Sequence, residues 1–265
     1  DEFFKIWDVS SGEAKEMTTV CCASVTDKIN GKWIEGEDVS PDGRLLVVGL
    51  NQGNIDLFDL RTGKKINTFA VSEEGALFGE TFSPDGSTLA VATTDNLQMW
   101  DVKTGHLSNT WPVTDGYIMT FSPDGKSLLV GTCLGTVNVL DVVTGENKFT
   151  LSGSASCVNS FGFSHDGTRV AIGSDSGPLE VWDWNTHEEV LQLPFGNAGT
   201  NFRMQFSPDD TRLMVSAFDA DAVVQNTVRV YVLLTKDIIA LAKSRLTRTF
   251  TLEECQKYLH VDKCP

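Results

Sequence analysis

The residues best able to do covalent chemistry are scattered through this chain and form no known catalytic pattern. Gly125-Lys126-Ser127 has the ending of a phosphate-binding loop, but such a loop needs a glycine where Thr120 stands. Gly153-Ser154-Ala155-Ser156 lacks the second glycine of a nucleophile elbow. The four histidines show no metal-binding spacing, and Asp219 and Asp221 lie in a long polar loop where a solvated role is favoured over a cation site. We therefore expect no catalytic, cofactor or metal site.

The six cysteines fall into three pairs by their surroundings. Cys133 and Cys157 lie in or beside predicted strands, and we expect both to be small core residues, as buried cysteines usually are. The vicinal pair Cys21-Cys22 is expected to stay reduced. Cys255 and Cys264 bracket a predicted helix and its return, where a turn would allow pairing, but a reducing cytoplasm favours free thiols.

A short phrase that recurs five times organises the whole chain. It reads Val-Ser-Pro-Asp-Gly, then Phe-Ser-Pro-Asp-Gly twice, Phe-Ser-His-Asp-Gly and Phe-Ser-Pro-Asp-Asp. The copies begin at Val39, Phe82, Phe121, Phe163 and Phe206, at intervals of 43, 39, 42 and 43 residues. A period near 40 residues is typical of a β-propeller with one four-stranded blade per repeat. Proline presets φ, aspartate bonds its own backbone and glycine takes a positive φ, so each phrase is predicted to be a turn.

Strand patterns fill the intervals between the phrases. An apolar run follows each phrase, and after a polar turn comes an alternating run, which buries every second side chain. These alternating runs are Ile55 to Asp59, Leu97 to Asp101, Val137 to Asp141, Leu179 to Asp183 and Val228 to Tyr231. One blade cannot bury its own faces, so the copies must stack around a common axis.

The order of phrase, apolar strand, turn and Trp-Asp resembles the WD-repeat family of β-propellers. Trp-Asp is present at Trp7-Asp8, Trp100-Asp101 and Trp182-Asp183, with Phe58-Asp59 and Leu140-Asp141 as variants. The resemblance covers residues 3 to about 232 and implies an all-β propeller. The Gly-His pair that the family often places before a blade is absent, so the family's Trp, Ser or Thr, His and Asp tetrad cannot form completely. We expect blade stability to depend more on apolar packing.

Counting strands predicts an incomplete ring in a propeller domain over residues 1–234. Phe3 to Val9 has the pattern of the third strand of a blade. Four complete blades are predicted over about 31–70, 75–112, 115–151 and 156–193, followed by three strands over 200–233. About five to six blades of a seven-bladed ring are therefore expected here, with the remaining strands upstream. A closed six-bladed ring that takes strands from elsewhere is the alternative.

Residues 235–265 break the repeat and predict a short tail of two helices. Apolar residues follow Thr235 at helical spacing, and Thr251-Leu252-Glu253-Glu254 is a capping box that begins a second helix. The tail also resembles the closing segment of bacterial WD-repeat proteins. In those proteins the propeller lies C-terminal to a STAND-type ATPase, cyclase or kinase module.

The charge balance limits the partners. Aspartate and glutamate exceed lysine and arginine by 36 to 21, and the tail contributes more bases than acids. An acidic propeller repels phosphate backbones and anionic lipid, so we expect it to bind neither nucleic acid nor membrane. The small basic cluster of Lys243, Arg245 and Arg248 is expected to be a solvated helix face or a clamp onto the blades.

The family resemblance also places partner contacts at a bulge in each blade's first strand, five and seven residues ahead of the phrase serine. The candidate partner-binding residues at these positions are Trp33, Glu35, Phe78, Asp115, Tyr117, Asn159 and Phe202. Exposed aromatic side chains commonly anchor interfaces. Packing against the neighbouring blade is the alternative role for each.

These patterns predict a non-enzymatic protein-interaction or sensor domain of a larger bacterial signalling protein in the cytoplasm. Its partner would be another protein or the upstream domains of the same polypeptide. A propeller associated with a hydrolase or peptidase is one alternative, although such propellers lack Trp-Asp after the third strand. A purely architectural scaffold is the other alternative.

Overall fold

The computed structural model describes residues 2–8, 15–23, 34–50, 53–72, 77–112, 116–152, 156–193, 201–218 and 227–233. Every regular element in these segments is a β-strand, and none of the described residues forms a helix, so no membrane-spanning helix is found among them. The predicted helical tail over residues 235–265 lies outside the described residues, as do Asp219 and Asp221.

Four complete antiparallel sheets follow one another along the chain, each with its strands in sequence order. Blade B comprises β3 (Ile34–Val39), β4 (Leu45–Leu50), β5 (Asn54–Asp59) and β6 (Lys64–Ala70). Blade C comprises β7 (Leu77–Phe82), β8 (Thr88–Thr93), β9 (Asn96–Asp101) and β10 (Leu107–Pro112). Blade D comprises β11 (Gly116–Phe121), β12 (Ser127–Thr132), β13 (Thr136–Asp141) and β14 (Asn147–Ser152). Blade E comprises β15 (Val158–Phe163), β16 (Arg169–Ser174), β17 (Leu179–Asp183) and β18 (Glu188–Leu193).

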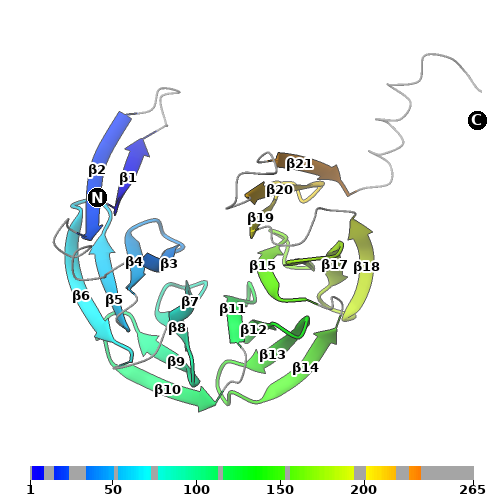
Figure 1. Cartoon of the computed structure of the whole chain (residues 1–265), viewed down its shortest axis with the longest axis horizontal. Helices are drawn as coiled ribbons and strands as arrows, with labels where there is room; N and C mark the ends of the chain where they lie inside the picture. Colours follow the sequence, from blue (N-terminus) through cyan, green and yellow to red (C-terminus); the bar gives the residue numbers. More distant parts are fainter. Residues whose placement is uncertain are drawn as a thin grey trace, which may run out of the picture.

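Two smaller sheets lie at the ends of this series. Strands β1 (Glu2–Asp8) and β2 (Lys15–Ala23) form a hairpin. Sheet F contains β19 (Asn201–Phe206), β20 (Arg212–Phe218) and β21 (Thr227–Val232). The sheets are arranged as an arc around a common axis, with first strands inside and fourth strands outside (Figure 1). The predicted grouping into repeats is confirmed.

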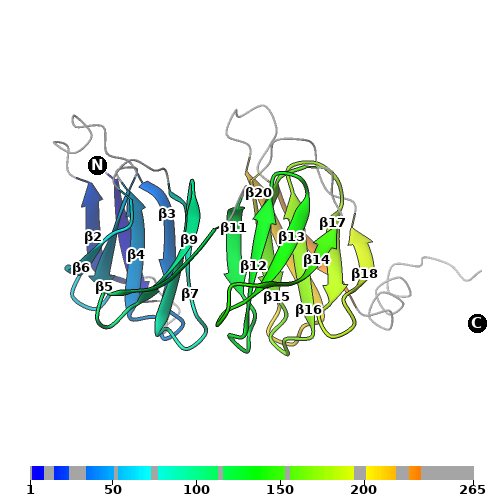
Figure 2. The ribbon, with the colours of Figure 1, turned by 90° about the horizontal axis from the view of Figure 1, so that it is seen from below.

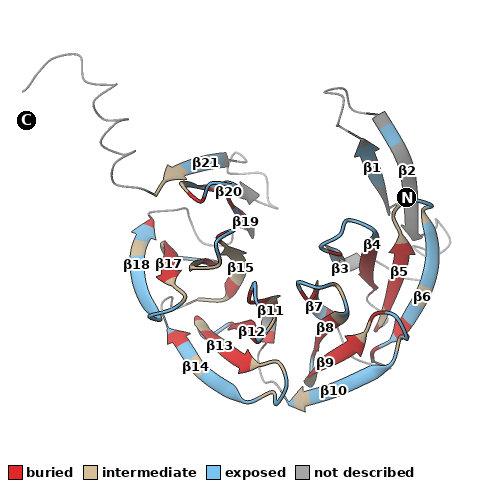
Figure 3. Ribbon diagram, turned by 180° about the vertical axis from the view of Figure 1, so that it is seen from behind, coloured by how far each residue is buried: buried red, intermediate tan, exposed pale blue. Residues whose placement is uncertain are grey.

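The core lies between neighbouring blades. The second and third strands of the complete blades are almost entirely buried, whereas the outer strands β10, β14 and β18 are mostly exposed (Figure 3). Between blades B and C, for example, Val47, Leu57 and Phe69 form one cluster with Leu89 and Trp100. Each blade therefore needs its neighbour to cover its apolar face, as repeat stacking requires.

The five phrases fold into the same turn. In every copy the serine hydroxyl donates to the aspartate Oδ1 at 2.6–2.7 Å, and the amide five residues after the serine donates to its Oγ at 2.9–3.0 Å. Gly125 has a φ of +69°, and Gly125-Lys126-Ser127 joins β11 to β12 as the predicted hairpin turn. In the fourth copy, the backbone N–H of Thr168 and the Ser164 hydroxyl lower the pKa of Asp166 to about 2.

Turns of neighbouring blades meet at one end of the ring, which is visible edge-on in Figure 2. At three junctions a phrase glycine faces the proline of the preceding phrase: Gly86 faces Pro41, Gly125 faces Pro84 and Gly167 faces Pro123. At the fourth junction both residues change. Asp210 stands in place of glycine, and its carboxylate accepts the backbone N–H of His165, the residue that replaces proline, at 2.8 Å. A proline has no N–H to donate, so the two replacements fit each other.

A polar contact that the sequence did not suggest also stabilises the blades. Trp100 Nε1 donates to Gln98 Oε1 at 3.0 Å, and Gln98 Nε2 donates to the carbonyl of Val71 at 3.0 Å. In blade E, Trp182 Nε1 donates to Glu180 Oε2 at 3.1 Å, while burial raises the pKa of Glu180. A polar residue two positions before the tryptophan therefore takes part of the role of the absent tetrad.

Sheet F has an apolar face that no blade covers among the described residues. Met214, Val228 and Val230 are 42%, 66% and 58% exposed. The counterparts of Val230 on the third strands of the complete blades are at most 2% exposed; these are Leu57, Met99, Val139 and Val181. Sheet F thus carries the surface of a blade-to-blade interface at the open end of the arc.

The expectation that Cys133 and Cys157 are core residues is wrong. Cys133 is exposed in the turn between β12 and β13, and Cys157 is half-buried just before β15. The two are joined in a disulfide. Their closeness to strands wrongly indicated a place in the core, because both residues lie just beyond the end of a strand, near the surface. Cys255 and Cys264 lie outside the described residues, and the side chains of Cys21 and Cys22 are not described.

Candidate interaction channel

The first strands of the complete blades carry the bulges that the family resemblance implied. The pairing register of each first strand with its second strand shifts by one residue. The residues skipped by these shifts are Glu35, Phe78, Tyr117 and Asn159. Phe202 differs, because it pairs regularly with Ala217 and sheet F has no bulge there.

Only two of the seven candidate residues have described side chains. Phe78 is 37% exposed, and Asn159 is half-buried. Asn159 Nδ2 donates to Asp175 Oδ1 at 2.8 Å, which fixes its amide against the β16–β17 hairpin. Trp33 and Asp115 lie outside the described residues, and of Glu35, Tyr117 and Phe202 only the backbone is described. The structure therefore places Phe78 and Asn159 along the same channel.

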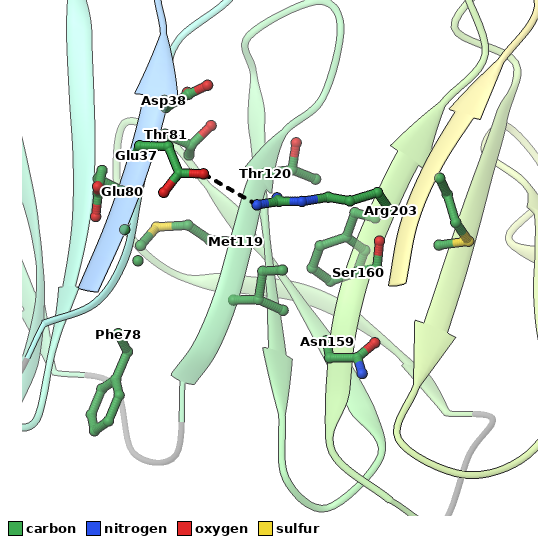
Figure 4. A pocket seen from close by; sticks show the side chains of 15 residues that line it. Glu37, Asp38, Phe78, Glu80, Thr81, Met119, Thr120, Asn159, Ser160 and Arg203 are labelled. Carbon is green, nitrogen blue, oxygen red and sulfur yellow. Dashed lines mark hydrogen bonds and ion pairs between the residues drawn. The ribbon is translucent and has the colours of Figure 1, made fainter. Parts of the chain in front are cut away.

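That channel runs between the inner strands and contains a cavity of about 460 Å³. The residues three and four positions ahead of every phrase serine line its wall. They are Gly36 and Glu37, Gly79 and Glu80, Ile118 and Met119, Ser160 and Phe161, and Arg203 and Met204. Phe78 and Asn159 line it as well. Figure 4 shows these side chains converging from strands far apart in the sequence.

Glu80 is the buried carboxylate of this wall, at 8% exposure. Its Oε1 accepts the backbone N–H of Gly49 from the neighbouring blade at 3.2 Å. A Cβ at Gly36 would lie 2.7 Å from Glu80 Oε2, and one at Gly49 would lie 3.0 Å from it. Both glycines thus leave the space that the carboxylate occupies between blades B and C.

Asp38 is the second carboxylate at the junction of blades B and C. Burial raises the pKa of Asp38, and the backbone N–H of Phe82, which donates to Asp38 Oδ2 at 2.8 Å, acts in the opposite direction. The side-chain hydroxyl of Thr81 also acts to lower it, but burial outweighs both hydrogen bonds and the pKa of Asp38 stays above its ordinary value. The bond to Phe82 ties β3 to β7, so Asp38 has a structural role as well as a place in the channel wall.

An ion pair crosses the channel. Arg203 Nη2 on β19 lies 3.4 Å from Glu37 Oε1 on β3, and the two residues are 166 positions apart (Figure 4). The Arg203 side chain is 76% exposed, so water screens the pair and it adds little stability. Among the described lining residues, Arg203 is the single basic one, against three acidic ones.

Sequence reasoning missed Glu37, Asp38, Glu80 and Arg203, although the signal was present. The bulge residues were found by counting five residues back from each phrase serine. Counting back two to four residues instead finds these four residues. The described strands and turns hold no group of three histidine, cysteine, aspartate or glutamate residues arranged for a metal ion. With three carboxylates and one guanidinium, the described wall is suited to binding a polar and partly cationic surface.

Stacked four-stranded antiparallel sheets around a lined channel define a β-propeller. Residues 145–183, from the turn before β14 to the end of β17, match the family model described as "WD domain, G-beta repeat". One repeat of the chain thus matches this family model, and the chain is similar to WD-repeat proteins.

Several characterised proteins are similar to this chain. Eukaryotic translation initiation factor 3 subunit I of Pyricularia oryzae is 26% identical over 69% of this chain and 58% of its own length. WD repeat-containing protein SL1-17 of Schistosoma mansoni is 31% identical over 50% of this chain and 44% of its own. Protein groucho of Drosophila melanogaster is 27% identical over 75% of this chain and 28% of its own. The chain therefore spans about half or less of the length of most of these relatives.

Among solved structures, hydrazine synthase of Kuenenia stuttgartiensis is similar with a TM-score of 0.64. The match covers 77% of this chain and 64% of that chain at 20% sequence identity. A likeness at this identity concerns the fold alone.

Proposed function

We propose that this protein is a non-enzymatic interaction or sensor domain of a larger bacterial signalling protein, and that a protein partner docks over the face where the channel opens beside Phe78. WD-repeat proteins generally mediate protein–protein interaction, and the chain is similar to several of them. The partner is another protein or the upstream domains of the same polypeptide. The domain works in the cytoplasm in this proposal.

One observation carries the proposal. Five inner strands present residues at the same two positions of their repeats to a single cavity of about 460 Å³. Ile118, Met119, Phe161 and Met204 also pack into the core clusters, and Glu80 bonds to Gly49. Glu37 and Arg203 are the exposed charged members of this wall, and in this proposal they contact the partner. An aromatic residue at the channel mouth, Phe78, is 37% exposed without belonging to that core. Exposed aromatic residues near the centre of a surface are favourable anchors for a partner.

Charge supports a protein partner over a nucleic acid or a membrane. The chain has a net charge of −15, and the described channel wall has three carboxylates and one guanidinium. Such a wall repels phosphate groups. We propose that the propeller binds neither nucleic acid nor membrane, and that it catalyses no reaction.

The exposed face of sheet F supports a ring with further blades. Met214, Val228 and Val230 are apolar, like the residues at the interfaces between complete blades, but they are exposed. We propose that another blade covers this face and that the complete ring has seven blades. A closed six-bladed ring would also cover this apolar face and stays the alternative.

A photo-crosslinking experiment tests the docking face. A photoreactive amino acid replaces Phe78 in the protein expressed in its own cells, and the matched control carries it at Val143, which is 81% exposed in the turn after β13 at the opposite end of the strands. We expect one defined protein adduct from position 78 and none from position 143. Adducts from position 143 alone, or from both positions equally, would overturn the proposal.

Binding of the partner identified in this way is then measured with two variants. One replaces Trp33, Phe78, Tyr117 and Phe202 by alanine together, and the other lacks residues 235–265. We expect the alanine variant to lose binding, since truncating several anchors costs on the order of 100-fold or more in affinity. Unchanged binding by both variants would refute the channel face as the site. Hydrolysis of a peptide or ester by the isolated chain would instead favour the enzyme-associated alternative.

A further inference from the structure

A covalent bond joins two blades at the end of the ring where the bulges lie. Cys133 belongs to the turn between β12 and β13 of blade D, and Cys157 immediately precedes β15 of blade E. Their disulfide spans 24 residues. It therefore connects one blade's hairpin turn to the entry strand of the next blade.

Strand pairing and core packing of the two blades do not involve this bond. The sheets of blades D and E each have four paired strands without it. A buried cluster already packs the two blades together, with Leu129 and Val139 of blade D against Val158 and Trp182 of blade E. The disulfide lies at the surface end of this interface. Its loss would loosen the end of the junction and leave the core in place.

Hydrogen bonds connect the disulfide to the channel. The carbonyl of Cys157 accepts the backbone N–H of Asp175 at 2.9 Å. Asp175 Oδ1 in turn accepts a hydrogen bond from Asn159 Nδ2 at 2.8 Å. Ser156, next to Cys157, bonds through its Oγ to the backbone of Ser176. A restraint on Cys157 is thus passed through Asp175 to the bulge residue Asn159.

The bond is accessible to a reductant. Cys133 is exposed, and the adjacent Leu134 is 73% exposed. Cys157 is half-buried, which directs an incoming thiolate to the sulfur of Cys133. Exposed disulfides are the ones that exchange readily with thiols.

We propose that Cys133 and Cys157 form a reversible redox site that exchanges with a low-molecular-weight thiol of the glutathione class and sets the rigidity of the blade D to blade E junction. The reductant's thiolate attacks Cys133 Sγ, forms a mixed disulfide and releases Cys157 as a thiolate, which takes a proton from water. A second reductant thiolate attacks the reductant sulfur of that mixed disulfide. The reductant leaves as its own disulfide, oxidised by two electrons, and Cys133 becomes a thiol on protonation.

Alkylation of the folded protein tests the reactivity. Protein purified in air is treated under native conditions with reduced glutathione at several concentrations, alkylated and mapped by mass spectrometry. We expect Cys133 and Cys157 to be protected before reduction and alkylated after it. Alkylation of both before any reductant would show that the bond does not form. Protection that persists until the protein is denatured would show a permanent cross-link instead of a reversible site.

Hydrogen exchange tests the consequence for the channel. The amide of Asp175 should exchange on the order of fivefold faster after reduction, because its acceptor at Cys157 is no longer held to blade D. Cys133→Ser should show the fast rate with or without glutathione. Ser156→Ala is the matched control, since it removes a neighbouring bond but keeps the disulfide and hence the response to glutathione. An Asp175 rate that reduction does not change would overturn the link to the channel. This test does not depend on the proposed partner.

Discussion

Replacing Asp210 by glycine would give the fifth phrase the ending of its other copies, and we expect this change to destabilise the protein. The Asp210 carboxylate accepts the backbone N–H of His165 at 2.8 Å and that of Asp166 at 2.9 Å, across the junction of blade E and sheet F. The residue is only 8% exposed, so water does not easily replace the carboxylate. Glycine would leave both donors without this acceptor.

The size of the effect follows from two opposing contributions. Hydrogen bonds to an ionised group contribute about 1.5 kcal/mol or more each. Asp210 has a φ of +55°, which costs a residue with a Cβ about 1 kcal/mol that glycine would recover. The free energy of unfolding of Asp210→Gly should therefore be lower by about 2 kcal/mol at neutral pH. Urea unfolding followed by tryptophan fluorescence measures it.

The loss should depend on pH in a defined direction. Burial raises the pKa of Asp210, but the backbone N–H groups of His165 and Asp166 outweigh it and hold the pKa below its ordinary value. A lowered pKa in the folded state means that the stabilisation is complete above the ordinary value, about pH 4, and is lost as the pH falls through the folded-state pKa. Wild type and Asp210→Gly should thus differ by a constant amount near neutral pH and converge below about pH 4.

A double-mutant cycle identifies the partner of the carboxylate. His165→Pro removes the backbone donor together with the imidazole, whose Nδ1 lies 3.2 Å from Asp210 Oδ1, and restores the proline of the other phrases. Asp210→Gly should therefore cost about 1 kcal/mol less in that background. Gly167→Asp is the matched control, because its carboxylate would face Pro123, which has no N–H. It should destabilise the protein. The reasoning fails if Asp210→Gly is as stable as wild type, or if the two changes at the junction are additive.

Two further predictions concern packing. Gln98→Leu removes the acceptor of the Trp100 indole and the donor to the Val71 carbonyl, and should lower the free energy of unfolding by about 2 kcal/mol; unchanged urea unfolding would mean that the contact contributes nothing. Val139→Ala, at a fully buried site, should cost about 2 kcal/mol, whereas Val230→Ala, at a 58% exposed site, should cost less than about 0.5 kcal/mol. Both variants are made in the 265-residue chain, without the further blade proposed above, so equal losses would show that another surface covers the Val230 face in solution.

The repeated phrase made the order of strands predictable. Turn chemistry is local, and the serine of each phrase is a fixed point from which strands and bulges can be counted. This is why the register shifts at Glu35, Phe78, Tyr117 and Asn159 agree with a count made from the sequence. The count failed at Phe202, where the strand pairs regularly, because a bulge depends on the partner strand as well as on its own residues.

The channel wall could be predicted only in part. A bulge inserts one residue into a strand, so the side chains after it change sides relative to those before it. Counting to the bulge therefore gave the mouth of the channel and missed Glu37 and Glu80 in its wall. Recognising Glu80 as buried also requires the two glycines of the neighbouring blade, and Gly49 lies 31 residues away from it.

Contacts between blades were the least predictable from the sequence. The disulfide joins a turn of blade D to the residue just before β15, and their proximity depends on how blade D stacks on blade E. The bond from His165 to Asp210 spans 45 residues, and each residue alone looks like an ordinary variation of a turn. Local propensity carries no information about which turn of one blade meets which turn of the next.

The paired replacement at His165 and Asp210 also has a consequence for how this chain can be rearranged. Three junctions use proline against glycine, so the turns on either side of them are interchangeable modules. The fourth junction is specific to its two sides: a sheet with the aspartate, placed beside a blade with proline, would lose the donor that His165 supplies and keep only the N–H of the following aspartate. Duplication, shuffling or design of single repeats is therefore open among blades B, C and D, whereas blade E and sheet F must be moved as a unit.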